Sequence, residues 1–211
     1  MDRFENRTDA GVRLAEQVRE LDLVDPLVLA LPRGGVPVAF EVAQVLSAPL
    51  DVFVARKIGA PGHREFGVGA IAEGGGLVAD QEVLDAIGVD PTTFDRLVAE
   101  ERVELDRRVR AYRGDRELPD LRGHDVVLVD DGLATGVTAE AAIDALGRLG
   151  ARRIVLAVPT CAPDSADRLR RLVDTAVCLI EPAGFAAVGQ WYERFDQTTD
   201  AEVEELLRAA R

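Results

Sequence analysis

Two adjacent carboxylates, Asp130 and Asp131, follow the apolar run Val126-Val127-Leu128-Val129. Such a run is typical of a strand buried on both faces, and the carboxyl end of such a strand is where open α/β folds bind ligands. Paired carboxylates at that position can accept hydrogen bonds from two vicinal hydroxyl groups of a sugar. The alternative interpretation is an ordinary strand-to-helix turn with two exposed acids.

The loop after the two acids has the composition of a phosphate site. It reads Ala134-Thr135-Gly136-Val137-Thr138 and leads into a helical pattern. A helix N-terminus offers free N–H groups and a positive dipole end, Gly136 permits close backbone approach, and the threonine hydroxyls can donate hydrogen bonds. The whole segment therefore predicts a sugar-phosphate site, with the diol on Asp130 and Asp131 and the phosphate on residues 134–138.

A second glycine-containing loop follows an earlier apolar run, Leu27 to Leu31. It reads Pro32-Arg33-Gly34-Gly35-Val36. The Arg33 guanidinium can donate two parallel hydrogen bonds to phosphate oxygens, and Gly34 and Gly35 expose backbone N–H groups at a helix start. By itself this pattern could be a plain strand-to-helix turn; beside the first motif it favours a second phosphate site.

Arg56 and Lys57 lie at the end of a third apolar run, Leu50 to Ala55, and Lys57 is the only lysine in the chain. We expect these cations to face a polyphosphate; the alternative is a solvated strand end. The next segment, Gly59 to Gly67, is polar and glycine-rich, and it predicts a loop. Glu73 ends the following strand pattern and is a weaker candidate for the site.

Composition excludes several classes of protein. Of the 211 residues 47% are hydrophobic, enough for a sizeable core, and the formal net charge is −13. Such acidity disfavours nucleic acid and membrane surfaces as partners. No apolar run is long enough for a membrane span or a signal peptide. Cys161 and Cys178 predict buried thiols rather than a disulfide framework, and a cytoplasmic location.

Short apolar runs alternate with amphipathic patterns through most of the chain, which predicts an α/β fold with a mostly parallel central sheet flanked by helices. The expected strands are 27–31, 50–55, 126–129, 154–158 and 176–180, and the segments 67–72 and 76–79 are expected to form a further hairpin or strand pair. The expected core helices are 36–46, 139–149 and 164–172.

Three further helices are predicted outside that alternation. Asp90-Pro91 is a helix start, and the pattern that follows predicts a long helix over 92–113, either a lid or dimer contact or an ordinary surface helix. Thr199 and Glu202 form a capping box for a C-terminal helix. Residues 10–21 are amphipathic, with Val12, Ala15, Val18 and Leu21 on the predicted buried face.

The segment from Val126 to Thr138 resembles the phosphoribosyl pyrophosphate (PRPP) motif of type I phosphoribosyltransferases, and the resemblance extends from about Leu27 to Phe195. One departure is Gly132, where family members usually carry an apolar residue. The resemblance implies one domain over 1–211, with a core at about 25–182, a helical insertion at about 81–118, and a small C-terminal hood and helix at about 183–211.

The resemblance also assigns roles. The Arg33 loop would hold the pyrophosphate and carry a strained or cis peptide at Arg33–Gly34, and Gly59 to Gly67 would be a mobile catalytic loop. Trp191 and Tyr192 would stack on the base in the hood; the alternative is that they anchor the C-terminal helix. Asp130 and Asp131 would hold Mg²⁺, directly or through PRPP and water.

The resemblance implies transfer of a 5-phosphoribosyl group from PRPP to a nitrogenous base, with release of pyrophosphate. Lys57, Arg56, Asp130 and Asp131 would be the catalytic residues. Dimers are common in the family, but the sequence leaves the oligomeric state open between a monomer and a homodimer. Ala134 stands where the 6-oxopurine enzymes carry an aspartate, so hypoxanthine and guanine are disfavoured as acceptors. The alternative function is a catalytically silent protein that senses PRPP or nucleotides.

Overall fold

The computed structural model describes residues 3–210, and its centre is a five-stranded parallel sheet. The strand order is β2-β1-β6-β7-β8, as expected from the alternating pattern. The strands are β1 (Leu27–Ala30), β2 (Leu50–Val52), β6 (Asp125–Val129), β7 (Arg153–Thr160) and β8 (Thr175–Ile180). Every residue of β1 and β6 is buried, which is why β1 and residues 126–129 of β6 are uninterrupted apolar runs.

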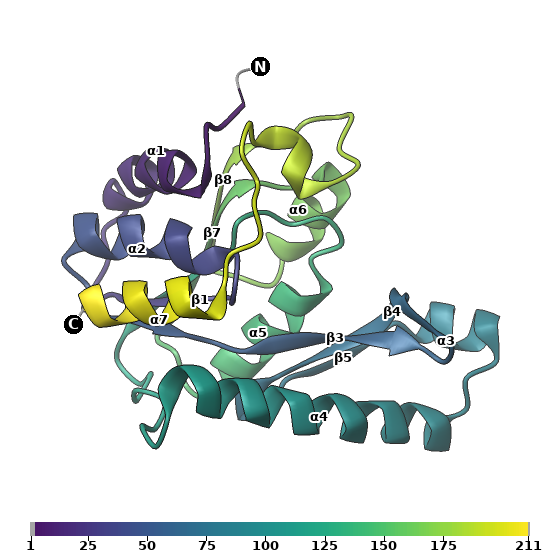
Figure 1. Cartoon of the computed structure of the whole chain (residues 1–211). Helices are drawn as coiled ribbons and strands as arrows, with labels where there is room; N and C mark the ends of the chain where they lie inside the picture. Colours follow the sequence, from purple (N-terminus) through teal and green to yellow (C-terminus); the bar gives the residue numbers. More distant parts are fainter. Residues whose placement is uncertain (1–2, 211) are drawn as a thin grey trace.

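Helices cover both faces of this sheet (Figure 1). They are α1 (Arg7–Arg19), α2 (Gly35–Leu46), α5 (Val137–Arg148), α6 (Pro163–Leu169) and α7 (Asp200–Ala209). The predicted cap of α7 is confirmed, because Thr199 and Glu202 make both hydrogen bonds of a capping box. The predicted buried face of α1 is wrong at Val12, which is 46% exposed, because the helix packs on Ala10, Gly11 and Leu14 instead.

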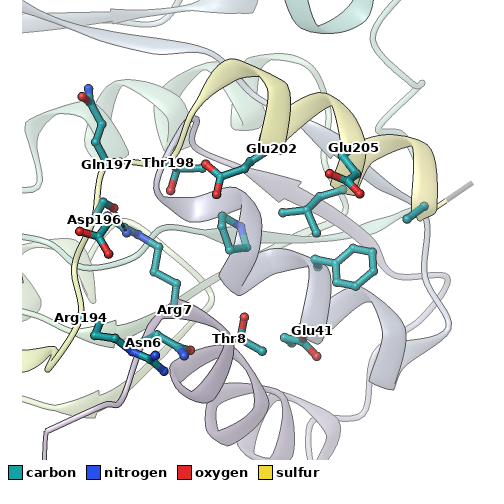
Figure 2. Close-up of a pocket in the computed structure, with 14 residues that line it drawn as sticks. Asn6, Arg7, Thr8, Glu41, Arg194, Asp196, Gln197, Thr198, Glu202 and Glu205 are labelled. Carbon is teal, nitrogen blue, oxygen red and sulfur yellow. Dashed lines mark hydrogen bonds between the residues drawn. The ribbon is translucent and has the colours of Figure 1, made fainter.

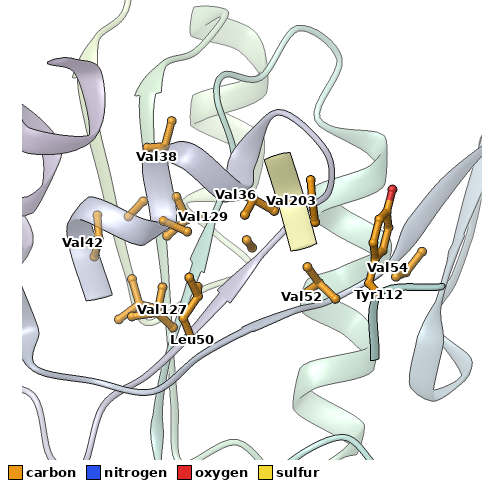
Figure 3. Packing of buried hydrophobic residues seen from close by; sticks show 14 of the residues in the cluster. Val36, Val38, Val42, Leu50, Val52, Val54, Tyr112, Val127, Val129 and Val203 are labelled. Atoms are coloured by element: carbon orange, nitrogen blue, oxygen red, sulfur yellow. The ribbon is translucent and has the colours of Figure 1, made fainter. Parts of the chain in front are cut away.

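Two cores result, one on each face of the sheet. The α2-side core also receives side chains from α1, α4 and α7; Figure 3 shows part of it. Its residues include Leu14, Val36, Val52, Ile58, Ile71, Leu105, Val127 and Val203. The α5-side core includes Leu29, Ala70, Ala72, Leu128, Ala141, Ala145, Leu156 and Leu169.

The chain between β2 and β6 forms a separate three-stranded antiparallel sheet that projects from the body (Figure 1). Its strands are β3 (Ala55–Ala60), β4 (His63–Ala72) and β5 (Leu77–Ala79), with the 3₁₀ turn η1 (Glu73–Gly75) between β4 and β5. The predicted single strand over 50–55 is therefore wrong. The chain leaves the parallel sheet after Val52, and Ala55 begins a strand of the second sheet.

The segment 59–67 is also different from the prediction, because it is the tip of the β3–β4 hairpin rather than a long loop. Only the turn at Pro61-Gly62 lies outside the two strands, and Gly62 has a φ of 75° there. Glycine and charged residues hide the alternation that normally reveals a strand.

Two helices lie along this projecting sheet. The long helix α4 (Pro91–Arg113) begins at the predicted Asp90 cap and runs beneath the hairpin, and α3 (Gln81–Ile87) lies near the hairpin tip (Figure 1). Both fall in the segment 81–118 expected to be a helical insertion. Leu105 and Tyr112 are the buried apolar contacts of α4. No helix within residues 3–210 is both long enough and apolar enough to cross a membrane.

Candidate active site

Asp130 and Asp131 lie directly after β6, at the carboxyl edge of the parallel sheet. The backbone N–H of Asp131 donates to Oδ1 of Asp130 at 2.8 Å. Burial raises the pKa of Asp130 well above its usual range, and the neighbouring Asp131 carboxylate raises it further. Burial also raises the pKa of Asp131, while Arg7 acts in the opposite direction. A ligand that offers hydroxyl groups or a cation would relieve this electrostatic cost.

The raised pKa of Asp130 has a consequence for the thermal stability of the Asp130→Asn variant. We expect Asp130→Asn to raise the Tm by about 3 °C at pH 7, since asparagine removes the cost of burying an ionisable carboxyl group and its amide oxygen can still accept from Asp131. The stability that a raised carboxyl pKa contributes is complete below the unfolded value of about 3.9 and is lost as the pH rises through the folded pKa. The Tm difference should therefore grow with pH in scanning calorimetry. A difference that stays constant between pH 4 and pH 8 would contradict this explanation.

The loop after β1 presses its backbone against the two acids. A Cβ atom on Gly34 would lie 2.0 Å from Oδ2 of Asp131, and one on Gly35 would lie 2.7 Å from the carbonyl oxygen of Val129. Any side chain at either glycine would displace the acids or the loop. The cis peptide bond of this loop joins Pro32 to Arg33, one bond earlier than the resemblance implied.

Residues 134–136 form the loop into α5, and Val137 and Thr138 are the first two residues of the helix, which begins two residues before its predicted start. Gly136 is the residue before the helix, with a φ of 67°, and no side chain of the described residues caps the helix. The first N–H groups of α5 have no intrahelical partners by geometry, so they are available to an anion. Neighbouring segments hold the loop by its carbonyl groups: Ser165 Oγ donates to the Ala134 oxygen at 2.6 Å, and Arg168 donates to the Thr135 oxygen.

Gly132, the departure from the family pattern, has a packing reason. A Cβ atom there would lie 2.6 Å from a Val188 methyl carbon and 2.8 Å from a Thr160 methyl carbon. Neighbouring side chains therefore fill the space that a side chain at position 132 would need. The loop keeps its position through Leu133, whose N–H donates to the Thr160 oxygen at 2.9 Å.

The two adjacent cations of β3 lie on opposite faces of the hairpin sheet. Arg56 pairs with Ile71 of the α2-side core, and Lys57 pairs with Ala70 of the α5-side core. Paired residues of antiparallel strands share a face, and consecutive residues alternate. Lys57 is exposed on the face that α5 covers, and α5 begins at the candidate phosphate loop.

The assignment of Arg56 to the same site as Lys57 is therefore wrong in geometry. The Arg56 guanidinium faces α4, where it lies 2.6 Å from a Glu101 carboxylate oxygen and 3.9 Å from one of Glu104. Its side chain is 20% exposed. Arg56 thus connects β3 to α4, and Lys57 is the β3 cation that remains a candidate for the reaction.

Arg7, at the start of α1, is a site residue that the sequence did not reveal. Its Nε donates to Oδ2 of Asp131 at 2.8 Å, and its Nη1 donates to the Asp196 backbone oxygen at 2.6 Å. Its guanidinium carbon lies 3.9 Å from the centre of the Phe195 ring. Nothing in the sequence around Arg7 indicates this role, because Asp131 is 124 residues away.

The prediction that Tyr192 stacks on the base does not agree with the position of its side chain. Tyr192 is 3% exposed, its ring lies against Phe4 and Phe195, and its hydroxyl donates to the Asp131 backbone oxygen at 2.5 Å. It has no free face for a base and instead fixes the backbone of Asp131. Trp191 is half-buried and stacks on Phe185, with ring centroids 6.4 Å apart, so it remains a candidate for the base.

Glu73 does not face the site. Its carboxylate is buried against Arg113 of α4, with an Nη1 to Oε2 distance of 2.6 Å, and it accepts from the Val54 N–H at 2.7 Å. Arg113 also donates to the Val52 oxygen at 2.6 Å. This ion pair therefore fixes the bend at which the chain leaves β2 and enters β3.

A cavity of about 560 Å³ lies between α1, α2, α7 and residues 194–198 (Figure 2). Arg7 lines it while reaching toward Asp131, and Figure 2 shows its guanidinium directed at Asp196. Four acidic residues and two arginines line the cavity: Glu41, Asp196, Glu202, Glu205, Arg7 and Arg194. The excess of negative charge does not suit a polyphosphate.

The donors fit Mg²⁺ when a substrate shares the coordination. Among the side chains that the structure describes, no group of three or more histidine, cysteine or carboxylate residues is arranged to hold a metal. Mg²⁺ commonly takes one or two protein carboxylates and completes its shell with substrate oxygens and water. Asp130 and Asp131 supply that number of hard oxygen donors.

The comparison with known proteins agrees with this geometry. The model of the phosphoribosyl transferase domain matches residues 2–193. The chain belongs to the phosphoribosyl transferase domain family. Its parallel sheet with helices on both faces is the fold class expected from the PRPP motif.

Individual relatives support the same family. The chain is 45% identical over 207 residues to “Putative phosphoribosyl transferase Rv0571c” of Mycobacterium tuberculosis H37Rv and to its counterpart MT0597 of strain CDC 1551. The match covers 98% of this chain and 47% of those proteins, so the chain spans about half the length of these curated relatives. The crystal structure of TT1426 from Thermus thermophilus is 45% identical, covers 97% of both chains and has a TM-score of 0.82.

The close approach of the Gly34 backbone to the Asp131 carboxylate leaves no room for a side chain at position 34. We expect Gly34→Ala to weaken PRPP binding at least tenfold, because the new methyl group would overlap the Asp131 carboxylate, and to lower the stability by about 1–3 kcal/mol. Gly147→Ala in α5 is the control, since a Cβ there meets nothing within 4 Å. Calorimetry with PRPP and thermal unfolding would measure both effects. Equal PRPP affinities for the two variants would contradict the assignment of this loop.

Proposed function

We propose that the protein transfers the 5-phosphoribosyl group of PRPP to a nitrogenous base and releases pyrophosphate. The observation that carries this proposal is the acid pair between two glycine-containing loops. The backbone of the first loop approaches the acids so closely that a Cβ atom added to Gly34 would lie 2.0 Å from Oδ2 of Asp131. Paired carboxylates suit ribose hydroxyls, and the start of α5 suits the 5′-phosphate. The loop with Arg33 suits the pyrophosphate.

The reaction needs little covalent chemistry from the protein. A base nitrogen forms a bond to C1 of the ribose and loses its proton to solvent, while the bond from C1 to the pyrophosphate oxygen breaks and its electron pair leaves with pyrophosphate. Asp130 and Asp131 orient the ribose and offset positive charge on the ring, while Lys57 and Arg33 stabilise the departing pyrophosphate. Asp130 and Asp131 would hold Mg²⁺, which would supply further positive charge near the substrate oxygens when bound.

Binding of the 5′-phosphate at residues 134–138 helps the reaction from a distance. Interaction energy at a group that does not react can be used to position the one that does. Trp191 is the proposed contact for the base. Ala134, in place of an aspartate, favours an acceptor other than a 6-oxopurine.

The test is incubation with PRPP, Mg²⁺ and a panel of purine and pyrimidine bases, followed by measurement of pyrophosphate and phosphate. Pyrophosphate release that depends on a base supports the transferase. Binding of PRPP without release supports a sensor protein, and release of phosphate alone supports a hydrolase. Omission of each base in turn identifies the acceptor.

A further inference from the structure

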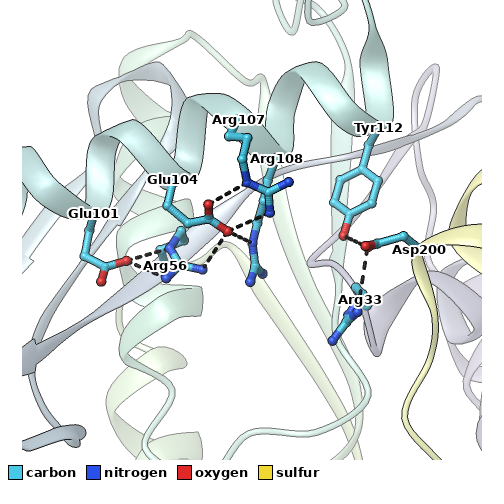
Figure 4. Close-up of polar contacts among 8 residues, drawn as sticks. All are labelled: Arg33, Arg56, Glu101, Glu104, Arg107, Arg108, Tyr112 and Asp200. Atoms are coloured by element: carbon cyan, nitrogen blue, oxygen red, sulfur yellow. Dashed lines mark hydrogen bonds and ion pairs between the residues drawn. The ribbon is translucent and has the colours of Figure 1, made fainter.

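Asp200, the first residue of α7, contacts the loop that we assign to pyrophosphate. Its Oδ1 lies 3.8 Å from Nη1 of Arg33, and the same oxygen accepts from the hydroxyl of Tyr112 at 2.6 Å (Figure 4). The Arg33 side chain is 29% exposed and that of Asp200 is 62% exposed. Three segments far apart in the chain therefore meet at one carboxylate.

Tyr112 keeps that carboxylate in place. It lies in the last turn of α4 and is 7% exposed, so its ring is fixed by packing in the α2-side core. Burial and the Asp200 carboxylate raise the pKa of Tyr112 to about 12. The hydroxyl consequently remains protonated near neutral pH and continues to donate to Asp200.

The helix α7 is itself held firmly against the core. Val203 and Leu207 are buried, and Figure 3 shows Val203 beside Val36 of α2 and near Tyr112. Val36 belongs to the same loop-to-helix segment as Arg33. Packing thus sets the position of Asp200 relative to the loop.

The family model ends at residue 193, so α7 lies outside the segment that it matches. The phosphoribosyl transferase domain as matched does not assign a function to Asp200. The contact with Arg33 gives this additional helix a direct connection to the site.

We propose that Asp200 and Tyr112 are positioning residues that hold the Arg33 guanidinium in place to receive pyrophosphate. This inference rests on the proposed function, which places pyrophosphate at Arg33. A held side chain loses less conformational freedom when it binds its ligand than a mobile one does. The Asp200 charge opposes the anion only weakly, because that side chain is mostly exposed and salt screens it.

The experiment measures two affinities by calorimetry at physiological salt: inorganic pyrophosphate with Mg²⁺, and ribose 5-phosphate. We expect Asp200→Asn and Tyr112→Phe each to weaken pyrophosphate binding about fivefold. Ribose 5-phosphate should bind unchanged, since its phosphate is assigned to residues 134–138. Glu204→Gln is the matched control: it removes the same charge from an exposed position of the same helix, and it should change neither affinity.

A double-mutant cycle separates positioning from a general loss of structure. In an Arg33→Ala background, Asp200→Asn should have no further effect on pyrophosphate, because the side chain that it positions is gone. An equal effect in both backgrounds, an equal loss of ribose 5-phosphate binding, or unchanged pyrophosphate affinity would each overturn the inference. If Tyr112→Phe does not fold, the Asp200→Asn variant alone tests the inference, because the Asp200 side chain is mostly exposed.

Failure of the proposed function gives a different result. In that case the wild-type protein binds neither PRPP nor pyrophosphate, and the inference falls with it. If the wild-type protein binds both and the variants bind equally well, only the role of Asp200 and Tyr112 is overturned.

Discussion

Replacing both Asp130 and Asp131 by asparagine is expected to reduce Mg²⁺-dependent PRPP affinity by at least about 100-fold. The two carboxylates are the proposed acceptors for the ribose hydroxyls and the proposed metal donors. Asparagine has nearly the same shape but no charge, and a hydrogen bond to a charged group contributes about 1.5–3 kcal/mol. Two such losses correspond to the predicted change in affinity.

Calorimetry with PRPP, with and without Mg²⁺, measures this effect. Asp164→Asn is the control, since Asp164 is an exposed acid in the first turn of α6, and its substitution should leave the affinity unchanged. The double variant should bind PRPP no better with Mg²⁺ than without it. Unchanged affinity in the double variant would show that PRPP binds elsewhere, and it would remove the basis for the proposed reaction.

Lys57→Ala is expected to lower kcat by about 100- to 1000-fold while changing PRPP affinity much less. The physical reason is that negative charge accumulates on the leaving pyrophosphate as the bond to C1 breaks. A cation aimed at that oxygen stabilises the transition state more than it stabilises the bound substrate. The effect should therefore be larger on turnover than on binding.

Arg56→Ala is a well-matched contrast, since Arg56 is the neighbouring cation on the same strand but faces α4. We expect its kcat to change less than about threefold, with the loss appearing mainly in thermal stability. Steady-state kinetics with an acceptor identified by the base panel measure both variants. Equal reductions of kcat in the two variants, or equal losses of kcat and PRPP affinity for Lys57→Ala, would contradict the assigned role.

The opposite faces of Arg56 and Lys57 show where sequence reasoning stops. The sequence predicts that both cations follow a strand, whereas the structure places them within β3, where consecutive side chains alternate between the two faces. The sequence does not show which face α5 covers and which face α4 covers. That choice depends on packing between elements that are far apart along the chain.

The roles of the aromatic residues in the hood also depend on contacts between distant segments. For Trp191 and Tyr192 the sequence predicts either stacking on the base or anchoring of the C-terminal helix. In the structure the two side chains have different surroundings. Tyr192 is enclosed by Phe4 and Phe195 and holds the Asp131 backbone, whereas Trp191 stays half-buried. Phe4 lies at the other end of the chain, so this enclosure could not be predicted locally.

By itself the sequence determined the alternation of strands and helices, the acid pair, both glycine-containing loops and the caps of α4 and α7. These features are local: buried strands need apolar runs, and helix ends need particular residues within one turn. Only the tertiary structure decided that Arg7 binds Asp131, that Asp200 binds Arg33, and that Arg56 turns away from Lys57. Those contacts join segments distant in the chain, and their geometry depends on how the helices pack against the two sheets.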